Sequence, residues 1–350
     1  MKAFLATVGF ETALVAELER ARHRARLRAP GVVVADPAET GTAGDDLVDP
    51  VFARQVLPDA RAVRGESVRA LAEAAYALVE ATIDGWPGPF SLHAVTIPGP
   101  PPGLASRVEL VGRELLDLLG SRRRRAFRRH VAAEPAPSPH DEARLLVQLL
   151  ALERGELLVS AVAPRRLPSG GLDLAPWPAG NAPVAVDRGP PSRAYQKLEE
   201  ALAWLGTEPR PDAVCVDLGA SPGGWTATLL KRRARVVAVD RAPLAAPLAR
   251  DARVSMVIGN AFTYAPASPV DWLVSDVICE PARSIDLIGR WLEQNLCRHL
   301  VVTVKFKGQS GYGILDTLPP LFAQIRPAFA RVKQLAHNKN EVTVMVRRSP

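Results

Sequence analysis

The first half of the chain mixes helix-spaced and strand-like hydrophobic patterns. Ser67 can cap a helix that runs to about Ile83, because apolar side chains recur three or four positions apart along it. Further helices are predicted over Glu11–Leu27 and Val108–Leu119, and strands over Val32–Val34, Phe90–Ile97, Leu145–Leu150 and Leu157–Val162. These elements lack a regular strand–helix–strand rhythm. This half is therefore predicted to form one or two small α+β modules.

After about residue 190, strands and helices alternate regularly. The strands VCVDL and LVVTVKF are apolar on both faces, as a buried parallel sheet requires. Strands are predicted over Ala213–Leu218, Arg235–Asp240, Val254–Ile258, Val270–Asp276, His299–Phe306, near Val332 and over Val342–Val346; helices are predicted over Ser192–Leu205, Trp225–Arg233, Ala282–Leu296 and Leu315–Ile325. The second half is predicted to be a doubly wound α/β domain.

Proline and glycine crowd three stretches of the chain, over Pro98–Gly103, Glu134–Pro139 and Pro164–Pro191. Proline lacks a backbone N–H and restricts the residue before it, so these stretches are predicted to be loops or linkers. The third is the longest, and it is predicted to be the main domain boundary.

The composition narrows the class of protein. With 47% hydrophobic residues among 350, the chain is not intrinsically disordered. Lys and Arg number 44 against 37 Asp and Glu, a net charge of +7 that favours a polyanionic partner.

Cysteine and hydrophobic runs predict the compartment. Cys215, Cys279 and Cys297 form no C-x-x-C spacing, so neither a disulfide framework nor a metal site is predicted, and all three are interpreted as small buried hydrophobic residues. The apolar run Ala3–Phe10 is too short for a secretory segment, and no run reaches the roughly 18 apolar residues of a membrane span. We expect a soluble, cytoplasmic protein with no membrane partner.

A glycine-rich turn carries the clearest chemical signal. The segment DLGASPGGW begins at Asp217, where a buried strand turns into a helix. Glycines there let the backbone approach a ligand and aim helix N–H groups at it. The next strand ends at Asp240, near the roughly 20-residue spacing at which an acidic residue accepts ribose hydroxyls. A plain tight turn is the alternative, but two acidic strand ends favour an adenosine-type ligand.

The charge of this turn separates two classes of ligand. The turn reads G-x-x-x-G-G and not G-x-G-x-x-G, and the Asp217 carboxylate would repel a dinucleotide pyrophosphate. It would attract the cationic amino-acid tail of S-adenosylmethionine. The sequence therefore favours a methyltransferase.

Five segments then carry a specific resemblance. DLGASPGGW, with SRAYQKLEEAL, VSDVICEP, VVTVKFK and NEVTV, resembles the FtsJ-type RNA ribose 2′-O-methyltransferases. Within that group the chain is most similar to the RlmM type, which methylates a cytidine of bacterial 23S ribosomal RNA. VGFE at Val8 and FARQ at Phe52 extend the resemblance to the first half.

The RlmM type joins small modules to a catalytic domain. The resemblance implies a ferredoxin-like module over 1–85, a THUMP-like RNA-binding module over 86–165, a linker over 166–190 and a Rossmann-like methyltransferase domain over 191–350.

The resemblance also implies a catalytic tetrad of Lys197, Asp276, Lys305 and Glu341. A ribose 2′-hydroxyl is a weak acid, so a general base with a pKa near the working pH is needed. We expect a dry pocket and the neighbouring Lys197 to lower the pKa of Lys305 toward neutrality. Asp276 and Glu341 would orient the lysines and the ribose.

Each member of this set has a plainer interpretation. Lys305 could extend from a strand end into solvent, and Lys307 shares its strand face, so the residues alone do not identify the base. Lys197 could be a solvated helix lysine, and Glu341 a surface charge. Asp276 stands out even without the resemblance, because it follows an apolar strand at the sheet edge where α/β folds bind ligands.

The cofactor set follows the glycine-rich turn and the two strand ends. It consists of Asp217, Gly219, Ala220, Ser221, Pro222, Gly223, Gly224, Trp225, Asp240, Asn260 and Asp276. Asn260 departs from the family, which usually has an acidic residue near the adenine, although an amide can still bond to an exocyclic amine.

Two arginine runs are candidates for RNA contact. Arg122, Arg123, Arg124, Arg125, Arg128 and Arg129 crowd one segment around Phe127, and a second run extends from Arg20 to Arg28. Such runs are either solvated faces or phosphate contacts.

The leading hypothesis is S-adenosylmethionine-dependent 2′-O-methylation of 23S ribosomal RNA or of its assembly intermediate. The alternatives are methylation of a transfer RNA or another ribosomal site, and a noncatalytic RNA-binding or ribosome-assembly factor. The basic first half disfavours a small-molecule methyltransferase.

Overall fold

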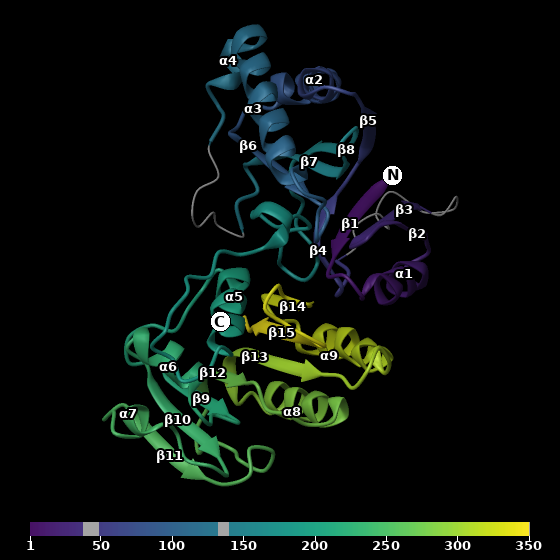
Figure 1. The fold of residues 1–350 in the computed structure, drawn as a ribbon. Helices are drawn as coiled ribbons and strands as arrows, with labels where there is room; N and C mark the ends of the chain where they lie inside the picture. Colours follow the sequence, from purple (N-terminus) through teal and green to yellow (C-terminus); the bar gives the residue numbers. More distant parts are fainter. Residues whose placement is uncertain (38–48, 132–139, 350) are drawn as a thin grey trace. The chain divides into compact units, whose positions relative to one another are not determined.

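The computed structural model describes residues 1–37, 49–131 and 140–349. The chain divides into two compact units, the first of residues 1–168 with 172–183 and the second of residues 184–350 with 169–171 (Figure 1). The proline-rich stretch Pro98–Gly103 is a loop, whereas the whole stretch Glu134–Pro139 lies outside the described residues. The residue ranges proposed for the ferredoxin-like and THUMP-like modules stay a prediction.

The first unit contains two four-stranded sheets, in the orders β2-β3-β1-β4 and β5-β8-β7-β6. Its strands are β1 (Lys2–Ala6), β2 (His23–Ala29), β3 (Val32–Pro37), β4 (Ala53–Leu57), β5 (Arg61–Arg64), β6 (Phe90–Thr96), β7 (Leu145–Glu153) and β8 (Glu156–Val162). Its helices are α1 (Glu11–Arg20), α2 (Val68–Gly85), α3 (Leu104–Arg122), α4 (Arg124–Phe127) and the short η1 (Pro178–Gly180). Apolar side chains from both sheets, α2 and α3 join one core.

Several elements of this unit confirm the hydrophobic pattern. Ser67 caps α2, because its Oγ accepts the Ala70 N–H at 3.0 Å. β5 precedes α2 in the chain yet pairs with β8, so residues from before and after position 85 share one sheet. Small α+β modules are therefore present, as predicted.

The helix predicted over Glu11–Leu27 is wrong in its second half. α1 ends at Arg20, and Arg22 takes a positive φ of 60° that an α-helix does not allow. Residues 23–29 then form the edge strand β2, antiparallel to β3. In a strand, alternate residues share a face. Arg24 and Arg26 therefore share an exposed face of β2 and do not crowd a helix end, and Arg28, exposed where the strand pairing shifts, pairs with Glu156 of β8.

The second unit is built on a seven-stranded sheet in the order β11-β10-β9-β12-β13-β15-β14. Its strands are β9 (Val214–Leu218), β10 (Arg235–Asp240), β11 (Val254–Ile258), β12 (Val270–Ser275), β13 (Cys297–Lys305), β14 (Phe329–Lys333) and β15 (Glu341–Arg347). Its helices are α5 (Tyr195–Leu205), α6 (Gly224–Lys231), α7 (Ala246–Ala249), α8 (Pro281–Glu293), η2 (Tyr312–Thr317) and α9 (Leu318–Ile325). α5 and α6 lie on one side of the sheet and α8 on the other (Figure 1). The predicted Rossmann-like, doubly wound fold is confirmed.

One strand departs from the parallel pattern. β9 to β13 pair in parallel, but β15 is antiparallel to both β13 and β14. The first residue of β15 therefore lies beside the last residue of β13, where Glu341 pairs with Lys305. The carboxyl ends of the parallel strands and the start of β15 thus share one edge of the sheet.

In the described part of the chain, no helix combines the length and the apolar character needed to cross a lipid bilayer.

Candidate functional site

A cavity of about 880 Å³ lies at the strand-end edge of the second unit. It is lined by most of the residues singled out in the sequence, namely Lys197, Asp217, Gly219, Ala220, Ser221, Pro222, Gly224, Trp225, Asp240, Asp276, Lys305 and Glu341. Segments far apart in the sequence therefore meet at one place.

Two lysines and two carboxylates form a closed ring of ion pairs in this cavity, here called the tetrad (Lys197, Asp276, Lys305 and Glu341). Lys197 Nζ lies 3.0 Å from Asp276 Oδ2 and 2.7 Å from Glu341 Oε1. Lys305 Nζ lies 2.5 Å from Asp276 Oδ1 and 2.6 Å from Glu341 Oε2. Thr303, buried two residues before Lys305 on β13, donates its hydroxyl to Asp276 Oδ1 at 2.7 Å. Both carboxylates therefore contact both ammonium groups.

The charges of the ring shift the pKa values of Lys305 and Glu341. Burial lowers the pKa of the Lys305 ammonium, but Asp276 and Glu341 raise it by more, so the net pKa lies above that of an ordinary lysine. Burial raises the pKa of Glu341, but Lys305 and Lys197 lower it by more, and the net pKa falls below the usual value. The expectation that Lys197 would push the pKa of Lys305 toward neutrality is therefore wrong, because two carboxylates outweigh one lysine.

Lys305 and Lys307 have different environments although they share a strand face by spacing. The Lys305 side chain is 18% exposed and points into the ring, whereas Lys307 is 85% exposed and pairs with Glu280 at 2.5 Å. β13 ends at Lys305, so Lys307 already lies in the following loop.

The glycine-rich turn brings backbone close to the cavity. Gly219 and Gly223 have φ of 78° and 115°, which side-chain-bearing residues rarely adopt. A Cβ on Gly219 would lie 2.9 Å from Val277 Cβ, so the two loops approach too closely for a larger residue. Trp225, on the first turn of α6, donates its indole N–H to Ala194 O at 2.7 Å, which ties α6 to the start of α5 and thus to Lys197.

Asp217 is buried beneath this turn. Thr226 Oγ1 donates to its Oδ2 at 2.7 Å. Burial raises the pKa of Asp217 to about 7, and the hydrogen bond from Thr226 opposes the rise only in part. The carboxyl group is therefore about half protonated near neutral pH, and it would attract a cationic ligand less than a free carboxylate.

Asp240 and Asn260 occupy neighbouring strand ends but make different contacts. Asp240 Oδ2 accepts the Ser221 N–H and its Oδ1 accepts the Ala242 N–H, each at 3.0 Å, so it organises the glycine-rich turn. Asn260 Oδ1 accepts the Phe262 N–H at 3.1 Å, and Asn260 is not among the described residues that line the cavity. Its proposed contact with the adenine stays a prediction.

A buried carboxylate on α5 was not predicted from the sequence. Glu200, three residues after Lys197 on α5, is fully buried and accepts the backbone N–H groups of Ala336 and His337 at 2.8 and 2.9 Å. It also contacts His337 Nδ1 at 2.7 Å. Glu200 thereby fixes the loop that leads to Glu341. A glutamate on the apolar face of a helix, in the run KLEEAL, was the available signal.

The cysteines differ in environment. Cys215 and Cys297 are buried, which raises the pKa of both thiols, that of Cys297 to about 12. Cys279 is half-buried at the cavity, with its Sγ 3.1 Å from Ser284 Oγ, so its interpretation as a buried residue is wrong. No group of three or more potential metal ligands occurs among the residues with described positions.

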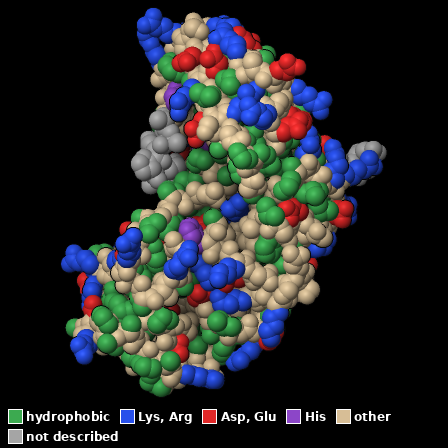
Figure 2. Space-filling view, in the orientation of Figure 1, with side chains coloured by type: hydrophobic (Ala, Val, Ile, Leu, Met, Phe, Trp, Pro, Cys, Tyr) green, Lys and Arg blue, Asp and Glu red, His purple; other side chains and the backbone are tan. Residues whose placement is uncertain are grey.

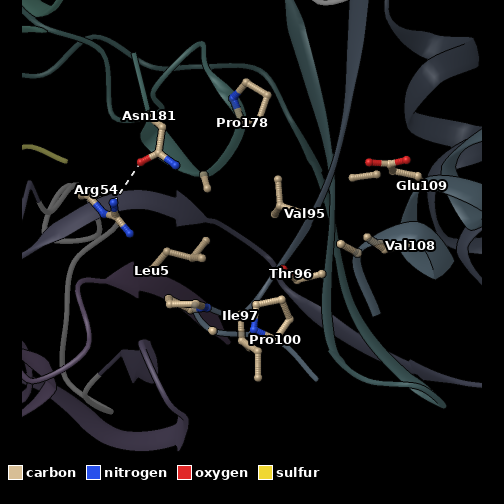
Figure 3. A pocket seen from close by; sticks show the side chains of 15 residues that line it. Leu5, Arg54, Val95, Thr96, Ile97, Pro100, Val108, Glu109, Pro178 and Asn181 are labelled. Atoms are coloured by element: carbon tan, nitrogen blue, oxygen red, sulfur yellow. Dashed lines mark hydrogen bonds between the residues drawn. The ribbon is translucent and has the colours of Figure 1, made fainter. Parts of the chain in front are cut away.

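A second cavity, of about 450 Å³, lies in the first unit (Figure 3). Its walls are mainly aliphatic, with side chains such as Val95 and Ile97. Arg54 Nη1 donates to Asn181 Oδ1 across its rim at 2.9 Å. Arg54 and Glu109 are the charged residues among its described lining, so it lacks a set of paired acids and bases.

The chain is similar to a known protein family and to two curated relatives. The family model described as FtsJ-like methyltransferase matches residues 190–308. A protein of Pseudomonas putida (strain GB-1), named ribosomal RNA large subunit methyltransferase M, is 39% identical over 212 residues, which cover 56% of this chain and 59% of that protein. A protein of the same name from Pseudomonas syringae pv. syringae is 39% identical over 188 residues, or 50% of this chain and 52% of that protein.

This chain matches between half and six tenths of the length of these curated relatives. The family match begins just before α5, ends just after Lys305 and includes the glycine-rich turn and three of the four tetrad residues. Residues 190–308 of this chain are therefore similar to the FtsJ-like methyltransferases.

Proposed function

We propose that the chain transfers the methyl group of S-adenosylmethionine to a ribose 2′-hydroxyl of RNA, at a cytidine of 23S ribosomal RNA. The observation that carries the proposal is the closed ring of Lys197, Asp276, Lys305 and Glu341 within an FtsJ-like methyltransferase domain. Two relatives named ribosomal RNA large subunit methyltransferase M support the RNA class. The proposed setting is the cytoplasm, on ribosomal RNA or an assembly intermediate.

The residues at the glycine-rich turn fit S-adenosylmethionine. Gly219 brings side-chain-free backbone to the cavity wall, and Asp240 can accept hydroxyl groups at the next strand end. Residues 217–225 and Asp240 would hold the cofactor, which supplies an electrophilic methyl group when bound. Asp217 would face its cationic end.

The tetrad would act on the acceptor hydroxyl. Asp276 and Glu341 hold the two ammonium groups in place, so Lys305 Nζ has a fixed position at the end of β13. Once Lys305 has released its own proton, its Nζ can take the proton of the 2′-hydroxyl. The Lys197 ammonium, paired with the same two carboxylates, would stabilise the oxyanion that forms.

Asp240→Ala should weaken binding of S-adenosylmethionine about tenfold or more. The change removes an acceptor for the ribose and both hydrogen bonds that organise residues 221 and 242. Isothermal titration calorimetry of the wild-type chain and the variant measures this. Unchanged affinity would remove Asp240 from the cofactor site.

The arginine run of the first unit separates into two groups. Arg122 pairs with Glu73, Arg123 pairs with Glu80 and Asp84, and Arg129 donates to Ile83 O, so these three brace α2. The others, here called the tip arginines, are Arg124, Arg125 and Arg128; they are exposed and form no ion pair with any described residue. Figure 2 shows Lys and Arg side chains gathered at the end of the unit that carries α4.

Replacing all three tip arginines with glutamine should weaken RNA binding, and it should make the RNA affinity less dependent on salt concentration. If about five phosphates are neutralised, log K falls against log salt with a slope of about −4, and losing three contacts should reduce its magnitude by about 2. Filter binding at several salt concentrations tests this. The double variant Arg122→Gln/Arg123→Gln is the control. It should lower thermal stability and change the salt slope less than the tip variant does. A tip variant with an unaltered slope would show that other residues contact the phosphates.

The proposed function itself is tested by mapping 2′-O-methylation in total RNA from a strain that lacks this chain. Loss of methylation at one 23S cytidine is the expected result. Loss of methylation at a transfer RNA or at another ribosomal position would identify that RNA position as the substrate. An unchanged map would favour the noncatalytic assembly factor.

A further inference from the structure

The loop after β12 holds a large aliphatic side chain in solvent at the tetrad cavity. Ile278 is 88% exposed, the highest value among the large hydrophobic side chains with described surroundings, and it lines the same cavity as Asp276. A single exposed aliphatic residue on an open surface is ordinary. In a cavity that also holds the four charged side chains of the tetrad, the Ile278 side chain offers apolar area that a ligand would remove from water.

The residues on either side of Ile278 are held in place. Val277 packs against the backbone at Gly219, as the close approach at that glycine shows. Cys279 Sγ lies 3.1 Å from Ser284 Oγ, and Glu280 pairs with Lys307. The exposure of Ile278 is therefore a property of a loop anchored on both sides.

The same contacts indicate which half of the cavity lies next to Ile278. β12 lies between β9, which leads into the glycine-rich turn, and β13, which ends at Lys305. Val277 faces the β9 side, whereas Glu280 reaches Lys307 just beyond β13. Ile278 lies between these two anchors in the chain, and the Glu280–Lys307 pair brings the loop beside the segment that follows Lys305.

We propose that Ile278 packs against the nucleotide whose ribose is methylated and helps to bind it at the tetrad cavity. The inference rests on the proposed function and adds a substrate-binding residue outside the tetrad. A nucleoside offers the apolar faces of a base and a sugar, which suit an aliphatic side chain. Because the contact forms on binding and takes no part in proton transfer, it should act on substrate affinity more than on the chemical step.

The test uses the full chain, S-adenosylmethionine with a labelled methyl group, and unmodified 23S ribosomal RNA transcribed in vitro. Ile278→Ala should raise the RNA concentration that gives half the maximal single-turnover rate about tenfold, while the rate at saturation stays within about threefold. Ile278→Leu, which keeps the apolar volume, should restore most of the affinity. S-Adenosylmethionine affinity and thermal stability should match the wild type.

Val186→Ala is the matched control, because Val186 is 83% exposed and is not among the described residues that line the cavity. It should behave as the wild type in every assay. If the wild-type chain is active and Ile278→Ala is indistinguishable from it, the inference is overturned. Loss of cofactor affinity equal to the loss of transfer also overturns it, since Ile278 would then contact the cofactor. A wild-type chain that methylates no ribosomal RNA overturns the proposed function, and the inference falls with it.

Discussion

Lys305→Ala should reduce methyl transfer by a factor of about 10²–10⁴ while S-adenosylmethionine binding is retained, because general-base catalysis typically contributes that much. Lys305→Arg should not restore activity, since a guanidinium does not release its proton near neutral pH. Single-turnover transfer rates together with calorimetry of the cofactor measure the two effects separately.

The ion pairs of the tetrad determine how the transfer rate of the wild-type chain should depend on pH. The pKa of Lys305 lies above the ordinary lysine value, so the neutral amine is scarce at pH 7 and its fraction grows about tenfold per pH unit. The transfer rate should rise through the neutral and mildly alkaline range without levelling off. A flat profile between about pH 6 and 9 would show that Lys305 acts as a fixed cation and not as the base.

Lys307→Ala is the control, because Lys307 extends into solvent and pairs with Glu280 outside the ring. At saturating RNA it should retain methyl transfer near the wild-type rate; RNA affinity is not part of this control, because the variant also loses the Glu280 contact beside the Ile278 loop. If Lys307→Ala abolishes transfer and Lys305→Ala does not, the base has been assigned to the wrong lysine. If neither variant loses activity, the proposed mechanism does not operate in this chain.

Asp276→Asn should lower transfer at least about 10²-fold and move its pH dependence to lower pH. The amide keeps the shape of the side chain but removes one of the two negative charges that hold Lys197 and Lys305. With that charge gone, the pKa of Lys305 should fall, so the rising part of the profile should begin earlier.

Transfer rates from pH 6 to 10 test this shift. Asp286→Asn, on the exposed face of α8, makes the same chemical change away from the cavity and should leave rate and profile unaltered. A profile that keeps its position in Asp276→Asn would mean that this carboxylate does not control the proton affinity of the base.

The sequence predicted the second unit better than the first. Continuous apolar runs such as VCVDL admit few structures other than buried strands, and the glycine-rich turn needs positive φ at Gly219 and Gly223. In the first unit, the arginines after Arg20 favoured a helix where β2 forms, because alternate charges on an edge strand resemble the polar side of a helix. β1 was missed because its run is short, although it is central in its sheet.

The residues of the candidate site could be predicted from the sequence, but the way their charges shift one another's pKa values could not. Lys305 and Glu341 meet only because β15 runs antiparallel to β13, a pairing that no local pattern reveals. The direction of the Lys305 pKa shift depends on how many carboxylates reach its Nζ, which is a property of the assembled fold. Glu200 was missed for the same reason, since its partners lie in a loop more than a hundred residues away in the chain.

The ring of ions has a consequence for how the protein would meet its substrate. Two ammonium groups and two carboxylates that alternate in a closed circuit carry no net charge, so their field fades within a few ångströms and exerts little pull on a distant polyanion. Attraction must then come from cations outside the ring, such as Arg193 and Lys339 at the cavity itself and the tip arginines of the first unit. Ionic strength should then govern how often RNA arrives more than it alters the ring.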